Sequence, residues 1–184
     1  LAIHQRGVRE GRGLGHDEQL EWNALAKSVR SKRPPFNTSS HISGYNLFMS
    51  AYHGLACIGE ERVPEPRPLP DFPVVCLELA SAAVLNGTDL QISFRINGDT
   101  ICDRLRIIGK IQLTAPGYGC HRGKLRNHIG TIYDDGQVIF TIQNYKDVSR
   151  LDLNEYQMHL RYLLIDAESG HRSREQSLSA GIGI

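Results

Sequence analysis

The amino-acid sequence predicts a mainly β protein, an antiparallel β-sandwich that is preceded by an N-terminal arm with two helices. Three observations predict this. Apolar residues recur every three or four positions in the first part of the chain, a run of prolines follows, and apolar and polar residues alternate from Pro73 onward. We therefore expect an arm at residues 1–62, a proline-rich linker at residues 63–73 and a β-sandwich domain at residues 74–184.

The composition is that of an ordinary folded protein. The 184 residues are 40% hydrophobic and 22% charged, and the formal net charge is +1, so bulk charge gives no attraction to nucleic acid. A chain of this length buries one sizeable core plus an appendage, and we expect one compact domain. Its longest apolar stretches, residues 72–79 and 160–165, are far shorter than the roughly 20 residues that a membrane-spanning helix needs. We expect no membrane span.

The first 16 residues are rich in glycine and carry Arg6, Arg9 and Arg12. Such a composition does not pack a core, so we expect this segment to be extended or disordered unless something else orders it. The first helix is expected from Asp17, with acids in its first turns and Lys27 near its end, as the helix dipole prefers. One face is apolar, and Pro34-Pro35 ends the pattern.

A second helix is indicated by Ser43 as N-cap and Gly59 as C-terminal cap. Its apolar surface is broad for a short helix, so it must pack against something. The large apolar side chains of the two helices are the candidate assembly residues: Trp22, Leu25, Tyr45, Phe48 and Tyr52.

Residues 63–73 have proline at nearly every second position. This spacing predicts an extended, semi-rigid connector and places the domain boundary there. A proline-rich segment can also be a ligand for aromatic grooves, and that alternative stays open.

The alternation of apolar and polar residues predicts half-buried strands in five stretches: residues 90–96, 105–113, 138–142, 156–164 and 176–184. Turn residues separate several of them, at Asn97-Gly98, Asp134-Asp135-Gly136 and Glu168-Ser169-Gly170. Several strands with turns and no intervening helices indicate a sandwich.

The C-terminal part resembles a known family. The run from Tyr156 to Asp166, followed by a glycine turn and a serine-rich last strand, resembles the final two strands of a fibronectin type III or related immunoglobulin-like domain. The match covers the last third of the chain, and residues 73–113 more loosely. The tryptophan that such domains often bury in the second strand is absent, since the only tryptophan is Trp22. The resemblance implies an immunoglobulin-like scaffold for binding or structure.

We expect no catalytic, cofactor-binding or metal site, and the protein is predicted not to be an enzyme. Leu125 follows Gly123-Lys124 where a P-loop needs Ser or Thr, and no zinc-protease, serine-hydrolase or dinucleotide motif occurs. Cys120, His121 and His128 could contribute to a metal site or a thiol–imidazole pair, but adjacent residues on an extended segment point to opposite sides.

The cysteines are widely spaced and form no C-x-x-C pair, which argues against a zinc ribbon. We expect most of them to be small buried apolar side chains, although two disulfides are possible: Cys57, Cys76, Cys102 and Cys120. The spacing does not decide the connectivity. The sequence Asn86-Gly87-Thr88 fits the glycosylation acceptor pattern, as does Asn37-Thr38-Ser39.

The charges separate along the chain. Six cations and no acid lie between Arg104 and His128, whereas eight acids outnumber five cations between Asp134 and Glu175. The first three cations, Arg104, Arg106 and Lys110, are predicted to share the polar face of one strand. The two surfaces are complementary, and they either pair within one domain or contact another molecule.

Two functions follow as expectations. The first is a non-catalytic structural subunit of an extracellular appendage or virion, which self-assembles through its N-terminal arm into a fibre, filament or virus-like assembly, so that its partners are copies of itself. The alternative is a module that binds a polyanion, a nucleic acid or an acidic glycan, with Tyr118 as a stacking surface. The polyanion would contact Arg104, Arg106, Lys110, Arg122, Lys124 and Arg126.

Overall fold

A computed structural model describes residues 2–30, 41–119, 125–145 and 152–182 of the chain. The protein is mainly antiparallel β, with helices in its N-terminal part, and it divides into two compact units. The helical unit consists of Leu1–Asp71 and Ile165–Arg172, and the β unit of Phe72–Leu164 and Ser173–Ile184. We expected one compact core with an appendage, whereas each unit has a hydrophobic core of its own.

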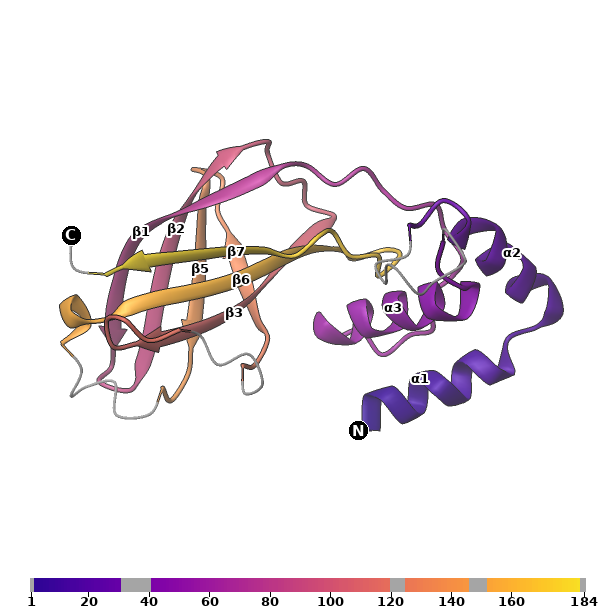
Figure 1. The fold of residues 1–184 in the computed structure, drawn as a ribbon, viewed down its shortest axis with the longest axis horizontal. Helices are drawn as coiled ribbons and strands as arrows, with labels where there is room; N and C mark the ends of the chain where they lie inside the picture. Colours follow the sequence, from indigo (N-terminus) through magenta and orange to yellow (C-terminus); the bar gives the residue numbers. More distant parts are fainter. Residues whose placement is uncertain (1, 31–40, 120–124, 146–151, 183–184) are drawn as a thin grey trace. The chain divides into compact units, whose positions relative to one another are not determined.

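The helical unit contains three helices, α1 (Ala2–Gly13), α2 (His16–Ala26) and α3 (Gly44–Cys57), which are labelled in Figure 1. Helices α2 and α3 occur in the two regions where the sequence predicts helices. The Ser43 hydroxyl accepts a hydrogen bond from the Asn46 N–H at 3.2 Å, as an N-cap does. Gly59 follows α3 in the left-handed region, with φ +81°. Within the described residues no helix is long and apolar enough to cross a membrane.

The expectation of an extended segment at residues 1–16 is wrong, because α1 occupies most of it. Its buried glycines, Gly7 and Gly11, are one helical turn apart and let α1 approach the aromatic side of α3. A Cβ atom at Gly7 would lie 2.8 Å from the Tyr52 ring, and one at Gly11 would lie 2.9 Å from the Tyr45 ring. Here glycine permits close packing between helices, whereas we had expected this glycine-rich composition not to pack a core.

The proline-rich segment has neither helix nor strand, as expected, but its first part is not a free spacer. Residues up to Asp71 belong to the helical unit. The Arg67 guanidinium forms an ion pair with Glu168 at 3.2 Å, and the Arg67 carbonyl lies 2.8 Å from Nε2 of His171. The turn at residues 165–172 therefore packs against this segment and completes the helical unit.

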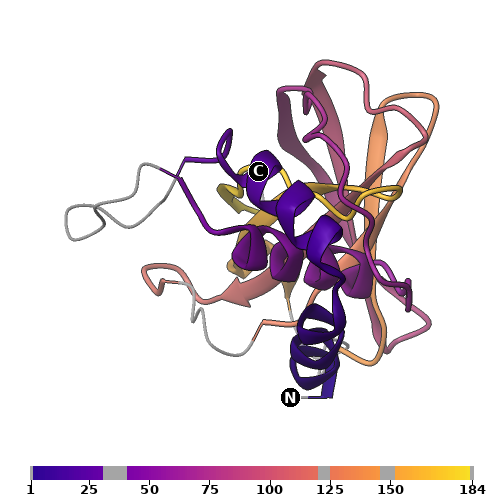
Figure 2. The ribbon, with the colours of Figure 1, turned by 90° about the vertical axis from the view of Figure 1, so that its right-hand side faces the viewer.

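The β unit contains one sheet of seven strands in the order β1-β2-β5-β4-β3-β6-β7. The ladders defined by the described residues are antiparallel. Figure 2 shows β1, β2 and β5 side by side. The strands are β1 (Val75–Leu85), β2 (Asp89–Gly98), β3 (Leu105–Thr114), β4 (His128–Ile132), β5 (Gln137–Ile142), β6 (Gln157–Asp166) and β7 (Gln176–Gly181), and the short 3-10 helix η3 (Leu153–Glu155) precedes β6.

The five alternating stretches of the sequence correspond to β2, β3, β5, β6 and β7. The turn expected at Asn97-Gly98 is wrong, because β2 continues to Gly98, which pairs with Val75. The β1–β2 turn lies instead at Asn86-Gly87, where both φ angles are positive, at 52° and 71°. Asn-Gly is the dipeptide that such tight hairpin turns prefer. The turn at residues 134–136 is confirmed, with Gly136 at φ +80° between β4 and β5.

The sheet curls around an apolar core that strands β1, β2, β3, β5 and β6 share. Tyr162 of β6 links the two strands at the ends of the strand order. Its hydroxyl accepts from the Leu77 N–H of β1 at 3.2 Å and lies 3.0 Å from the Val75 carbonyl of the same strand. The hydroxyl also lies 2.9 Å from Oε1 of Gln176 on β7. Burial raises the pKa of Tyr162. The seven strands form one continuous order, and the immunoglobulin-like topology implied by the resemblance is not confirmed.

Candidate functional site

The five candidate assembly residues all lie in the helical unit, and they build its core more than its surface. Trp22 and Phe48 are 1% and 0% exposed, and their rings meet edge to face with centroids 5.6 Å apart. Leu25 and Tyr52 are half-buried, whereas 43% of Tyr45 is exposed. Trp22 and Phe48 do not reach another molecule while this core is intact. Tyr45 is the most exposed member of the set.

The candidate polyanion-binding residues are only partly brought together. Arg106 and Lys110 lie on the same side of β3, but Arg104 lies in the turn before that strand, which corrects the predicted three-residue stripe. The Arg106 guanidinium donates to the carbonyl oxygens of Asp103 and Leu105. Arg126 is exposed before β4, and Arg122 and Lys124 lie outside the described residues.

The predicted acidic surface is divided between the units, and much of it is used internally. Asp166 is fully buried and accepts from the Ser169 N–H at 3.2 Å. Glu168 pairs with Arg67, and Glu175 pairs with Arg161. The sequence count of acids therefore overstates the charge that is free to meet a basic partner.

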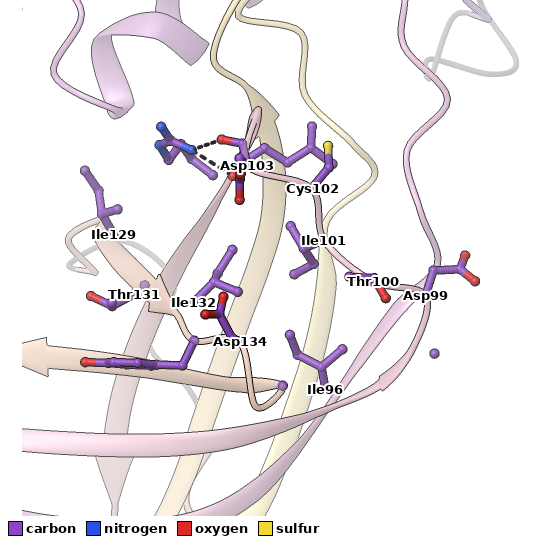
Figure 3. A pocket seen from close by; sticks show the side chains of 16 residues that line it. Ile96, Asp99, Thr100, Ile101, Cys102, Asp103, Ile129, Thr131, Ile132 and Asp134 are labelled. Atoms are coloured by element: carbon purple, nitrogen blue, oxygen red, sulfur yellow. Dashed lines mark hydrogen bonds between the residues drawn. The ribbon is translucent and has the colours of Figure 1, made fainter.

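A cavity of about 940 Å³ in the β unit is shown in Figure 3. It lies between the end of β2, the loop before β3, strand β4 and the β4–β5 turn. Ile96, Ile101 and Ile132 form an apolar part, and the carboxylates of Asp103 and Asp134 add charge. This volume is in the range of small-molecule sites. The residues that line it include Cys102 and no histidine.

Sequence reasoning missed a buried polar turn at residues 166–171. The Ser169 hydroxyl donates to the Asp166 carboxylate and accepts from the His171 N–H, and all three residues are at most 2% exposed. The arrangement has the residue types of a catalytic triad. However, Nε2 of His171 lies 2.8 Å from the Arg67 carbonyl, so the imidazole is not placed to activate the serine. Burial lowers the pKa of His171. The cluster stabilises the turn.

A pair of histidines was also missed, because its members are far apart in the sequence. Nδ1 of His4 on α1 lies 3.2 Å from Nε2 of His53 on α3, and the ring planes differ by 13°. Burial lowers the pKa of His53, and the neighbouring His4 and Arg172 lower it further. His53 is half-buried in this contact.

The cysteine expectation is wrong for the described part of the chain. Cys76 and Cys102 are exposed free thiols, and Cys57 is half-buried. Cys120 and His121 lie outside the described residues, so the thiol–imidazole alternative is not addressed. Burial and the nearby Arg126 lower the pKa of the remaining member, His128. Within the described residues no group of three or more potential ligands could hold a metal ion.

The two edge strands of the sheet carry little charge. Strands β1 and β7 stand at the two ends of the strand order. Residues 79–85 of β1 and all of β7 contain no charged side chain. An uncharged edge strand leaves backbone donors and acceptors open to another strand. No protein-family model matches this chain, and no match was found among curated proteins.

Proposed function

We propose that the protein is a non-catalytic structural subunit that assembles with copies of itself into a fibre, a filament or a virus-like assembly. The observation that carries this proposal is the absence of charged side chains from residues 79–85 of β1 and from all of β7, the strands at the two ends of the sheet. Natural sheets usually protect their edges with charge, proline or a covering element. Edges without charge are suited to strand addition between molecules.

The two edges differ in sequence, so a contact between β1 of one copy and β7 of the next is heterologous. Heterologous contacts produce a closed ring when the rotation closes and a filament when it does not. In this proposal the β unit is the body of the subunit, and we propose an immunoglobulin-like sandwich as its more specific fold class. The helical unit is the arm, and the exposed Tyr45 is available for a second contact.

Part of β1 is already protected against the addition of another strand. Glu78 is exposed, and the register with β2 shifts between Leu79 and Ser81, which bends the edge. From Ser81 to Leu85 the ladder to β2 is regular. We therefore place the intermolecular ladder at residues 81–85.

The test uses two lysine substitutions in one row of the sheet. Gln91 of β2 pairs with Ala83 on the edge strand and with Thr141 on the interior strand β5. The side chains of Ala83 and Thr141 are both exposed. Light scattering and negative-stain microscopy should show assemblies for the wild-type protein and for Thr141→Lys. Ala83→Lys should form smaller species, because its charge would be desolvated in the ladder. A wild-type protein that stays monomeric would overturn the proposal.

The polyanion-binding module is the second candidate. It is supported by Arg106 and Lys110 on one side of β3 and by Tyr118, which is 70% exposed. Binding of DNA or of an acidic polysaccharide should then weaken steeply with added salt. Affinity that does not change between low and moderate salt would count against this function.

A further inference from the structure

The chain contains two Asn-Gly dipeptides, Asn86-Gly87 and Asn97-Gly98, and all four residues are exposed. In such a dipeptide the backbone nitrogen of the glycine can attack the side-chain amide carbon of the asparagine, because glycine has no Cβ atom in the way. The attack requires the backbone to leave its native conformation, so the surrounding structure controls the rate. The two dipeptides lie in opposite kinds of structure.

Asn86-Gly87 forms the turn between β1 and β2 and belongs to neither strand. Both residues have positive φ angles, 52° and 71°, a region that is unfavourable for residues with a side chain. The Thr88 N–H closes the turn by donating to the Leu85 carbonyl at 3.1 Å. The Gly87 N–H donates to no backbone carbonyl of the described residues, and apart from its chain neighbours no atom lies within 4 Å of a Cβ position built on Gly87. The attacking nitrogen is therefore unpaired and has open space around it.

Asn97-Gly98 is held by the sheet. Both residues lie within β2, where Gly98 pairs with Val75 of β1. A Cβ atom at Gly98 would lie 2.5 Å from the Val74 carbonyl oxygen, and the Asp99 N–H donates to the same oxygen at 3.1 Å. The Asp99 carboxylate in turn accepts from the Val74 N–H at 3.0 Å. Movement of this dipeptide therefore requires the end of the ladder between β1 and β2 to open.

We propose that Asn86 is a modification site, which converts spontaneously to aspartate and isoaspartate, and that strand β2 protects Asn97 from the same reaction. The Gly87 nitrogen loses its proton and bonds to Cγ of Asn86, and the bond from Cγ to the amide nitrogen breaks. That nitrogen takes up a proton and leaves as ammonia. Water then opens the cyclic imide. Attack of water on Cγ gives aspartate, whereas attack on the backbone carbonyl carbon gives isoaspartate.

The new carboxylate would lie at the end of the proposed intermolecular ladder, because residues 81–85 end directly before Asn86. The Asp89 carboxylate, which accepts from the Thr88 hydroxyl at 3.0 Å and from the Asn144 N–H at 2.9 Å, already places a negative charge at this hairpin. A second charge adds repulsion, and charge protects an edge strand against strand addition. Deamidation of Asn86 would therefore weaken assembly. This consequence rests on the proposed self-assembly, whereas the reaction itself does not.

The experiment incubates the full-length protein at mildly alkaline pH in water enriched in heavy oxygen, which labels each new carboxylate. Mass spectrometry of proteolytic peptides then gives the rate at each asparagine. In the folded protein Asn86 should convert at least about tenfold faster than Asn97, since reaction at Asn97 first requires ladder hydrogen bonds to break. In concentrated urea the two rates should be similar, because no strand then protects Asn97.

The products test the chemical route. Opening of a cyclic imide gives two products of equal mass, aspartate and isoaspartate, which separate in chromatography. Equal rates at Asn86 and Asn97 in the folded protein, no conversion of Asn86, or aspartate as the only product would overturn the proposal.

The consequence for assembly is tested with Asn86→Asp, and Asn97→Asp is the matched control with the same change of charge. Light scattering should give a lower mass for Asn86→Asp than for the wild type, and a wild-type mass for Asn97→Asp. Wild-type mass for both variants would show that charge at this turn does not act on assembly. A monomeric wild type would overturn the self-assembly alone, because the deamidation rates are measured independently of it.

Discussion

The helical unit and the β unit build their cores by different means. In the β unit, inward-facing aliphatic and Phe side chains of alternating strands fill the interior, with Phe94 and Phe140 in edge-to-face contact at 5.9 Å. In the helical unit, aromatic rings pack directly against glycines, and the polar turn of Asp166, Ser169 and His171 is buried beside them. The β core depends on a repeated pattern, whereas the helical core depends on single close contacts. Substitutions should therefore affect the two units differently.

The largest expected effect comes from deleting one ring in each core. Phe48→Ala and Phe140→Ala should each lower the free energy of unfolding by about 3–5 kcal/mol, since both side chains are fully buried. Trp22 emission reports the helical unit, and far-UV circular dichroism reports the strands. In chemical denaturation, Phe48→Ala should lower the midpoint of the Trp22 transition more than Phe140→Ala does. Equal shifts would mean that the two cores unfold together.

The next effect tests the close contacts of the helical unit. A Cβ atom at Gly54 of α3 would lie 1.9 Å from the Gly170 carbonyl oxygen, so Gly54→Ala should cost about 3 kcal/mol of stability. Gly13→Ala is the matched control, because no atom lies within 4 Å of its Cβ position. This control should be neutral or stabilise the helix by up to about 1 kcal/mol. Thermal unfolding monitored by Trp22 emission measures both, and similar melting temperatures would contradict the packing role of Gly54.

Acid should destabilise the helical unit by a smaller amount. Burial lowers the pKa of both His53 and His171, so the unfolded chain binds more protons than the folded unit as the pH falls below about 6.5. Stability is therefore full above that pH and decreases as the pH falls toward the lowered pKa values. Urea midpoints from Trp22 emission at several pH values measure this slope. His53→Gln should reduce the slope, and an unchanged slope would exclude His53 as a contributor.

The smallest effect concerns a helix end. Ser43→Ala removes the hydroxyl that accepts from the Asn46 N–H and should cost about 1 kcal/mol. Ser177→Ala, at an exposed position of β7, is the control and should change stability by less than about 0.5 kcal/mol. The difference between the urea midpoints of the two variants measures the contribution of the N-cap hydrogen bond to stability. Equal midpoints would show that α3 is held by tertiary packing alone.

The same contrast explains how much the sequence predicts. The strands of the β unit were predictable because alternation is local, as from Leu90 to Ile96, and Ser43 and Gly59 indicated the ends of α3. Helix α1 was not predictable by these rules, since Gly7 and Gly11 have a role only when Tyr52 and Tyr45 lie against them.

The candidate sites follow the same division. Hydrophobic spacing identified Trp22 and Phe48 as residues of apolar helix faces. It could not show whether a partner molecule or the chain itself covers them. Which strands form the edges depends on strand order, and a small cavity of the helical unit depends on the meeting of three helices. Neither property is local in sequence, so neither could be derived from spacing or composition.

The central claim is self-assembly through the sheet edges, and the molecular mass tests it most directly. Multi-angle light scattering over a range of protein concentrations should give masses well above the 20.6 kDa of one chain for the wild type and for Thr141→Lys, and lower masses for Ala83→Lys. A mass of 20.6 kDa for the wild type at every concentration would contradict the account.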